Sequence, residues 1–138
     1  MTTNNGTLLG VYDIRYNSSV DLQEKIDIGV SRSTDKGQTW EPMRVAMTFK
    51  QTDGLPHGQN GVGDPSILVD EKTNTIWVVA AWTHGMGNER AWWNSMPGMT
   101  PDETAQLMLV KSEDDGKTWS EPINITSQVK DPSWYFLL

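Results

Sequence analysis

The sequence contains no cysteine, which excludes disulfide bonds and thiolate metal sites. Only two histidines are present, and neither has a partner at the spacing of a metal site. No apolar run reaches the roughly 20 residues that a bilayer-crossing helix needs, and the first residues do not follow a signal-peptide pattern. We therefore predict no thiolate or histidine metal site and no membrane-spanning segment.

Positive charge is also scarce. The chain has 11 lysines and arginines against 18 aspartates and glutamates, which gives a formal net charge of −7 at pH 7. Nucleic acids and anionic membranes attract basic surfaces, so this balance argues against both as partners. An anionic substrate would need a local cluster of arginines.

One eight-residue pattern occurs twice, at residues 33–40 and 112–119, and follows the template Ser-x-Asp-x-Gly-x-Thr-Trp. The positions that carry it are Ser33, Asp35, Gly37, Thr39 and Trp40, and then Ser112, Asp114, Gly116, Thr118 and Trp119. The copies begin 79 residues apart, and each stands between two strand-like runs. We therefore interpret the pattern as the turn of a hairpin within a repeated unit.

Each residue type in the pattern has a use in such a turn. The aspartate can accept hydrogen bonds from backbone N–H groups two or three residues on, and the glycine supplies a positive φ. The tryptophan is expected to start the outgoing strand and to pack against its neighbour. Neither copy has the spaced oxygen ligands and closing glutamate of a calcium loop, so both copies are predicted to be structural.

Hydrophobic alternation predicts strands at about 7–15, 26–32, 41–49, 66–70, 76–83, 106–111, 120–126 and 133–138, and no helix. Two connections, Lys50 to Asp64 and His84 to Thr104, are long enough to carry function. The first contains a glycine-rich stretch, residues 58–63. It lacks the glycine order of a dinucleotide fingerprint and leads into a strand, so a phosphate cradle is disfavoured.

The repeated pattern resembles the Asp-box, or bacterial neuraminidase repeat, which marks the turn between the outer strands of a β-propeller blade. The resemblance implies an all-β fold, here a partial six-bladed β-propeller of about two four-stranded antiparallel blades. A propeller needs at least four blades of roughly 40–50 residues, so 138 residues cannot close the ring. We expect residues 1–138 to be the N-terminal part of a larger catalytic domain, with one strand missing upstream and about four blades downstream.

The order of strand, Arg15, short loop, Asp21, strand, Asp-box and then Asp64-Pro65-Ser66 resembles bacterial exo-α-sialidases along essentially the whole chain. That resemblance makes Asp21 the general acid/base. It places Arg15 near the carboxylate and O4 side of the sugar, and Asp64 near O4 or the N-acetyl group. Asp13 is interpreted as structural.

The reaction implied by the resemblance is retaining hydrolysis of terminal α-linked sialic acids from glycoconjugates, without a metal or organic cofactor. These enzymes use a tyrosine nucleophile rather than a second carboxylate. The expected substrate is a sialylated glycan, and the parent protein is expected in the periplasm, at the cell surface or secreted.

The chain also departs from the family pattern. The Arg-Ile-Pro motif with the first carboxylate-binding arginine is absent. The other two arginines of that triad, the nucleophilic tyrosine and its glutamate partner would lie downstream. The isolated segment is therefore expected to be inactive.

Other interpretations remain open from the sequence. Asp21 could be an ordinary loop residue, Arg15 a salt-bridge partner and Asp64 a turn residue before a proline. The whole could be a non-catalytic Asp-box propeller that serves as a binding or assembly scaffold, or a glycosidase of plant or bacterial polysaccharides. Trp92 and Trp93 could line a substrate pocket or pack onto a neighbouring blade.

Overall fold

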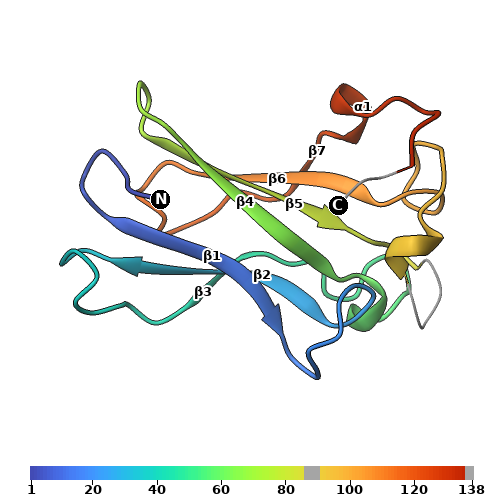
Figure 1. The fold of residues 1–138 in the computed structure, drawn as a ribbon, viewed down its shortest axis with the longest axis horizontal. Helices are drawn as coiled ribbons and strands as arrows, with labels where there is room; N and C mark the ends of the chain where they lie inside the picture. Colours follow the sequence, from blue (N-terminus) through green and yellow to red (C-terminus); the bar gives the residue numbers. More distant parts are fainter. Residues whose placement is uncertain (86–90, 136–138) are drawn as a thin grey trace.

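The computed structural model describes residues 1–85 and 91–135, which form two antiparallel β-sheets. The first sheet has the order β1-β2-β3 and the second the order β4-β5-β6-β7 (Figure 1). The strands are β1 (Leu8–Arg15), β2 (Ile26–Ser33), β3 (Arg44–Met47), β4 (Val62–Asp70), β5 (Thr75–Trp82), β6 (Gln106–Ser112) and β7 (Ile123–Asn124). Three short helical turns complete the fold: η1 (His57–Gln59), η2 (Ala91–Asn94) and α1 (Thr126–Val129).

A single hydrophobic cluster joins the two sheets. Strands β1 and β2 of the first sheet pack against β4 of the second. The cluster takes side chains from both sheets, among them Ile28 and Val30 of β2 and Val78 of β5, all fully buried. At one edge the ring of Phe49 stacks on Trp82, with centroids 4.3 Å apart. Strands of both sheets thus share one core, and the structure confirms the predicted all-β fold of antiparallel sheets.

Several predicted boundaries were wrong. The segment 120–126 forms only the two residues of β7 and then turns into α1, although no helix was expected. The predicted strand 133–138 is not formed in residues 133–135, which lie in a turn, and residues 136–138 are outside the described part. β7 pairs with β6 through only Met108 and Leu109, so little of this outer strand is fixed by a partner.

The two Asp-box turns have the same hydrogen-bond pattern. In the first, Ser33 Oγ donates to Asp35 Oδ1 and accepts from the Gly37 N–H, both at 2.8 Å. In the second, Ser112 and Asp114 repeat these two bonds at 2.8 and 2.9 Å, with Gly116 as the N–H donor. Both glycines have the positive φ predicted for them, 85° and 81°.

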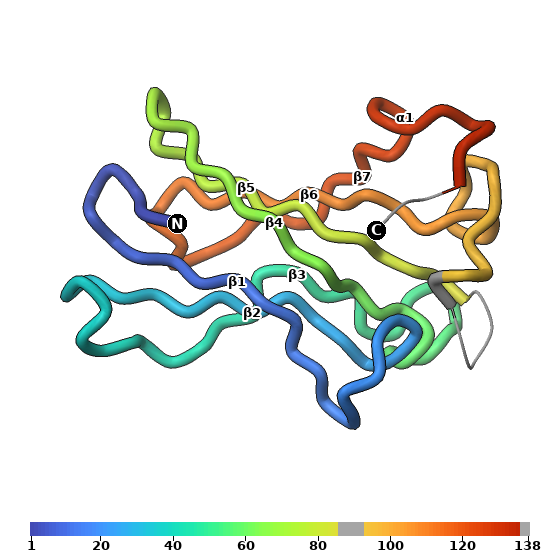
Figure 2. The backbone as a smooth tube through the Cα atoms, in the orientation of Figure 1, coloured from blue at the N-terminus to red at the C-terminus, as the bar shows by residue number. Residues whose placement is uncertain are grey.

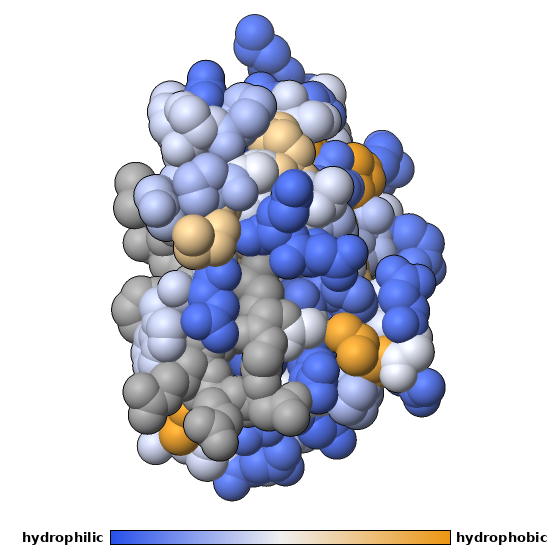
Figure 3. Space-filling model, turned by 90° about the vertical axis from the view of Figure 1, so that its right-hand side faces the viewer, coloured by the Kyte–Doolittle hydropathy of each residue, from blue (hydrophilic) through white to orange (hydrophobic). Residues whose placement is uncertain are grey.

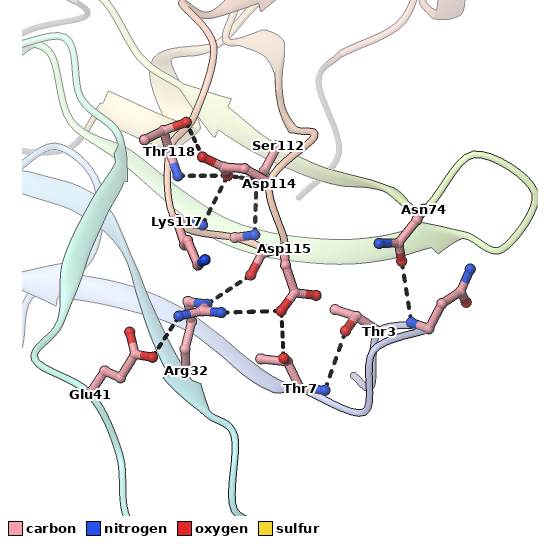
Figure 4. Close-up of polar contacts among 12 residues, drawn as sticks. Thr3, Thr7, Arg32, Glu41, Asn74, Ser112, Asp114, Asp115, Lys117 and Thr118 are labelled. Atoms are coloured by element: carbon pink, nitrogen blue, oxygen red, sulfur yellow. Dashed lines mark hydrogen bonds and ion pairs between the residues drawn. The ribbon is translucent and has the colours of Figure 1, made fainter.

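The threonine of each box closes the turn on the same aspartate. Its backbone N–H and its hydroxyl donate to the two carboxylate oxygens, in Thr39 to Asp35 and in Thr118 to Asp114. Figure 4 shows the second of these turns. In both boxes the threonine that donates its backbone N–H is four residues beyond the aspartate, not two or three as expected. In the second box the N–H of Lys117, three residues beyond Asp114, also donates to that carboxylate.

The tryptophans differ from the prediction. Neither starts a strand, because β3 begins at Arg44 and β7 at Ile123. Trp119 packs against the core cluster, whereas Trp40 is half exposed.

We predict that Asp114→Asn makes the fold less sensitive to acid. Burial opposes ionisation of Asp114, but the hydrogen bonds from Thr118, Ser112 and Lys117 outweigh it and lower its pKa to about 2. The stability from these bonds is present above the ordinary aspartate pKa and is lost as pH falls toward 2. Thermal unfolding between pH 2 and 7 should show the variant less stable at neutral pH, with a smaller loss on acidification. If the variant lost as much stability between pH 7 and pH 2 as the wild type, the prediction would be contradicted.

The boxes and the long connections lie at opposite ends of the molecule (Figures 1 and 2). Ser33 pairs with Leu8 at the start of β1, and Arg15 closes the other end of that strand. Eight extended residues separate these ends by roughly 26 Å. The chemistry predicted around Arg15 is therefore remote from the structural boxes.

Candidate functional site

The loop after β1 and the start of β4 bring charged residues together at the end opposite the boxes. Arg15 ends β1, Asp21 lies in the loop 16–25 that returns to β2, and Asp64 lies near the start of β4. Outside the residues drawn in grey, the face of the molecule in Figure 3 is mainly hydrophilic. The structure thus assembles the three residues that the sequence nominated, from three separate segments.

Arg15 is the centre of the cluster. Its Nη2 lies 2.8 Å from Asp13 Oδ2 and 3.2 Å from Asp21 Oδ1. Its Nη1 donates to the carbonyl oxygen of Ser19 at 2.9 Å. Strand and loop are therefore tied through one guanidinium, which holds the Asp21 carboxylate over the end of β1.

Asp13 belongs to this cluster as well, although the sequence interpretation left it structural. One carboxylate oxygen binds Arg15, and the other accepts the backbone N–H of Asp64 at 3.0 Å. Asp13 and Arg15 are two residues apart on a strand, so their side chains point to the same face. That spacing was the signal in the sequence. Asp13 is the link between Arg15 and Asp64.

Asp64 lies within β4, whereas the predicted strand began only at residue 66. The register with β5 shifts between Gly63 and Ser66, as at a β-bulge, and Asp64 has a φ of 54°. A bulge interrupts the ladder and redirects a side chain, and such features are frequent next to active sites. Pro65, which has no N–H to donate to the ladder, is tolerated at such an irregularity.

Burial raises the pKa of Asp64, and the nearby charges of Asp21 and Asp13 raise it further, whereas Arg15 lowers it. Two like charges close to a partly buried carboxyl disfavour its ionised form. The site therefore holds one carboxyl that takes up a proton more readily than an ordinary aspartate does.

We predict that Asp64→Asn stabilises the fold at neutral pH. The raised pKa of Asp64 means that folding favours its protonated form, so this contribution is full at low pH and is lost as pH rises through the folded-state pKa. Asparagine removes the ionisation. The difference in thermal midpoint between variant and wild type should therefore grow from pH 3 to pH 7. Asp70→Asn is the control, and it should destabilise the fold at neutral pH. Hydrogen bonds from Thr73 and Lys72 lower the pKa of Asp70, so folding favours its ionised form.

The cluster has three carboxylates for one guanidinium, so it is acidic overall. Such a site suits hydrogen bonds to hydroxyl groups and transfer of a proton, but it repels a carboxylate. Arg32 and Arg44 pair with Glu41 at the box end of the molecule. Arg90 lies outside the described residues. A carboxylate-bearing substrate would need arginines supplied from elsewhere.

The two histidines support loops. His57 Nε2 lies 2.8 Å from the buried Asp27 carboxylate, and His84 Nδ1 lies 2.7 Å from Asn60 Oδ1. Within residues 1–85 and 91–135, no three acidic or histidine side chains are placed to hold a metal ion together. In the same part of the chain, no helix has the length and apolar character needed to cross a membrane. Trp93 lies on η2 with its side chain about half exposed.

Comparison with known proteins identifies the family. A family model described as a BNR repeat-like domain matches residues 1–138. The chain belongs to the BNR repeat-like domain family. Its two Asp-boxes are the repeats of that name, and its two sheets are the corresponding blades.

The relatives of this BNR domain include sialidases. Over 138 residues it is 75% identical to a sialidase of Bacteroides fragilis (strain YCH46), covering all of this chain and 25% of the relative. It is 80% identical to the structure of the Hadza microbial sialidase Hz136, with a TM-score of 0.94, covering 96% of this chain and 26% of that one. The intramolecular trans-sialidase of Ruminococcus gnavus shares the fold, with a TM-score of 0.75 at 14% identity over 93% of this chain and 47% of that one. The chain thus spans about a quarter of the length of the first two relatives.

Proposed function

We propose that this BNR domain is part of a longer exo-α-sialidase that hydrolyses terminal α-linked sialic acids from glycoconjugates with retention of configuration. The observation that carries the proposal is the convergence of Arg15, Asp21 and Asp64 at one end of the two sheets. The 75% identity to a sialidase over the whole chain supports it. Residues 1–138 would supply the first blades, with a strand upstream of β1 and about four blades downstream completing the ring. The substrate implies export to the periplasm, the cell surface or the medium.

In this proposal Asp21 is the general acid/base. Its side chain is 46% exposed, so a glycosidic oxygen can reach it, and Arg15 fixes its position. Asp21 would donate a proton to the leaving oxygen and then accept one from the attacking water in the second half-reaction. Arg15 and Asp64 would contact the sugar from the floor of the site.

The acidic character of the cluster supports a division of labour. The substrate's carboxylate would be bound by arginines from the remaining blades, and the nucleophile would be a tyrosine there, the exception among glycosidases. The described segment would contact the hydroxyl-bearing side of the sugar and the leaving group. The isolated chain would then have no turnover.

The alternative of a non-catalytic scaffold explains the boxes, which are structural in either case. It gives no reason for a bulge that carries Asp64 to Asp13 and Arg15. A retaining polysaccharide glycosidase would need a second carboxylate as nucleophile, and Asp13 is engaged by both Arg15 and the Asp64 N–H.

The test uses the longer protein that carries this chain, with 3′-sialyllactose as substrate and unsialylated lactose as the blank. Proton NMR at early times should show free sialic acid appearing first as the α-anomer, before mutarotation. Release of the β-anomer first would contradict retention. A folded protein that releases no sialic acid would contradict the proposed function.

A further inference from the structure

The loop that carries Asp21 is anchored by the two residues that follow it. Residues 16–20 of this loop are exposed, yet Leu22 is 2% exposed and Gln23 is 6% exposed. Asp21 is next in sequence to this buried pair, and its carboxylate accepts the Leu22 N–H at 2.9 Å. The position of the carboxylate therefore depends on how this pair is held.

The side-chain amide of Gln23 makes three hydrogen bonds to Gly61 and Thr83, which flank strands β4 and β5. Its Nε2 donates to the carbonyl oxygen of Thr83 at 3.1 Å. Its Oε1 accepts the Gly61 N–H at 3.1 Å and the Thr83 hydroxyl at 2.8 Å. These three hydrogen bonds of a buried amide favour one geometry, because another would leave polar groups unpaired. Thr83 and Gly61 are themselves joined by a backbone bond of 3.0 Å.

The glycine-rich stretch 58–63 is the surface on which this pair docks. A Cβ at Gly61 would collide with the carbonyl oxygen of Glu24 and would lie 2.7 Å from Leu22 Cδ2. A Cβ at Gly63 would contact the Asp13 carboxylate and Leu22 at 3.5 Å. The stretch itself is fixed by Asn60, which is fully buried and bonded to His84. Glycine here permits close approach of the Asp21 loop rather than binding of a phosphate.

We propose that Gln23 is a positioning residue that sets the place of the Asp21 carboxylate by clamping its loop to Gly61 and Thr83. The proposal rests on the proposed sialidase function and on Asp21 as its acid. Gln23 does not contact the reacting atoms in this scheme; it acts through Asp21. A carboxylate displaced by about 1 Å can lose a factor of 100 in rate, so loss of the clamp should be visible in catalysis.

The test compares two substrates that differ in their need for an acid. Lactose is a poor leaving group and must be protonated, whereas 4-nitrophenolate departs with little help. In the longer protein, Gln23→Ala should lower kcat/KM for 3′-sialyllactose by about 10–100-fold, which is part of the roughly 100-fold or more that a general acid contributes. For the 4-nitrophenyl α-sialoside it should fall less than about 3-fold, because kcat/KM there reports a step that needs little acid.

Gln106→Ala is the matched control. Gln106 is 1% exposed, and its amide bonds to Met99, Thr104 and Asn124, so its loss also removes a buried amide. This control should change kcat/KM by the same factor for both substrates. If Gln23→Ala does not fold, Thr83→Val is used instead, because it removes the hydrogen bond from the Thr83 hydroxyl to Gln23. It should lower kcat/KM for 3′-sialyllactose about 3–10-fold relative to the nitrophenyl substrate.

The outcomes separate the two ideas. An active wild type in which Gln23→Ala, or Thr83→Val in its place, affects both substrates alike overturns the role of Gln23 and leaves the sialidase intact. A wild type that cleaves neither substrate overturns both. Selective loss on 3′-sialyllactose, absent from Gln106→Ala, establishes the role.

Discussion

Asp21→Asn is expected to lower kcat for 3′-sialyllactose by about 100-fold or more in the longer protein, with KM changed far less. A general acid/base contributes about 10²–10⁴-fold, and asparagine keeps the shape of aspartate while it can neither give nor take the proton. The side-chain oxygen of the asparagine can still accept hydrogen bonds from Arg15, now at 3.2 Å, and from the Leu22 N–H, now at 2.9 Å. The loop should therefore keep its place, and the loss should appear in turnover rather than in binding.

Asp53→Asn is the control for this change. Asp53 is exposed in the loop before η1 and has a φ of 48°, a conformation that asparagine also tolerates. It should leave kcat and KM at their wild-type values. An Asp21→Asn enzyme that keeps more than about half of its turnover on 3′-sialyllactose would remove Asp21 from the general acid role. Equal thermal midpoints of the two variants would show that the comparison is between folded proteins.

The parts of this molecule that sequence could predict are those that repeat or that follow a short-range rule. The box turns repeat at the same spacing of serine, aspartate, glycine and threonine, and their bonds close within five residues. The structure reproduces them twice with distances that agree within 0.1 Å for the serine bonds. Strand β2, in which apolar and polar residues alternate, and strand β5, which is a run of apolar residues, were also predicted to within one residue of their ends.

The sequence predicted which residues belong to the site, but not the contacts that hold them together. Asp21, Arg15 and Asp64 came from resemblance. The contact of Asp13 with Asp64 and those of Gln23 with Gly61 and Thr83 join residues 38 to 60 positions apart in the sequence, which no local pattern reports. The bulge at Asp64 escaped because Gly63 and Pro65 in the sequence look like a loop. Only the pairing of Val62 and Gly63 with β5 shows that the strand has already begun. Likewise α1 is too short for a helical period to show in the sequence.

Arg32 gives the largest stability effect that we expect from one substitution. It immediately precedes the first box, is 3% exposed, and spans the two sheets (Figure 4). Its Nη1 lies 2.6 Å from Glu41 Oε1, its Nε donates to the Asp115 carbonyl oxygen at 2.7 Å, and its Nη2 lies 3.1 Å from Asp115 Oδ2. Asp115 belongs to the second box, so one side chain holds the two box turns together.

Arg32→Met should lower the free energy of unfolding by about 3 kcal/mol, because it leaves the Asp115 carboxylate and carbonyl without their buried partner. Arg44→Met is the matched control: Arg44 binds the same Glu41 at 2.8 Å, but it is 37% exposed. A surface pair of this kind contributes about 0–1 kcal/mol. Urea unfolding of both variants in the longer protein checks the difference. Equal losses would mean that the Glu41 contact, which they share, accounts for the effect, and that the bridge from Arg32 to the second box stabilises little. A loss confined to Arg32→Met would show that the two Asp-boxes, which look like independent turns in the sequence, are coupled through this residue.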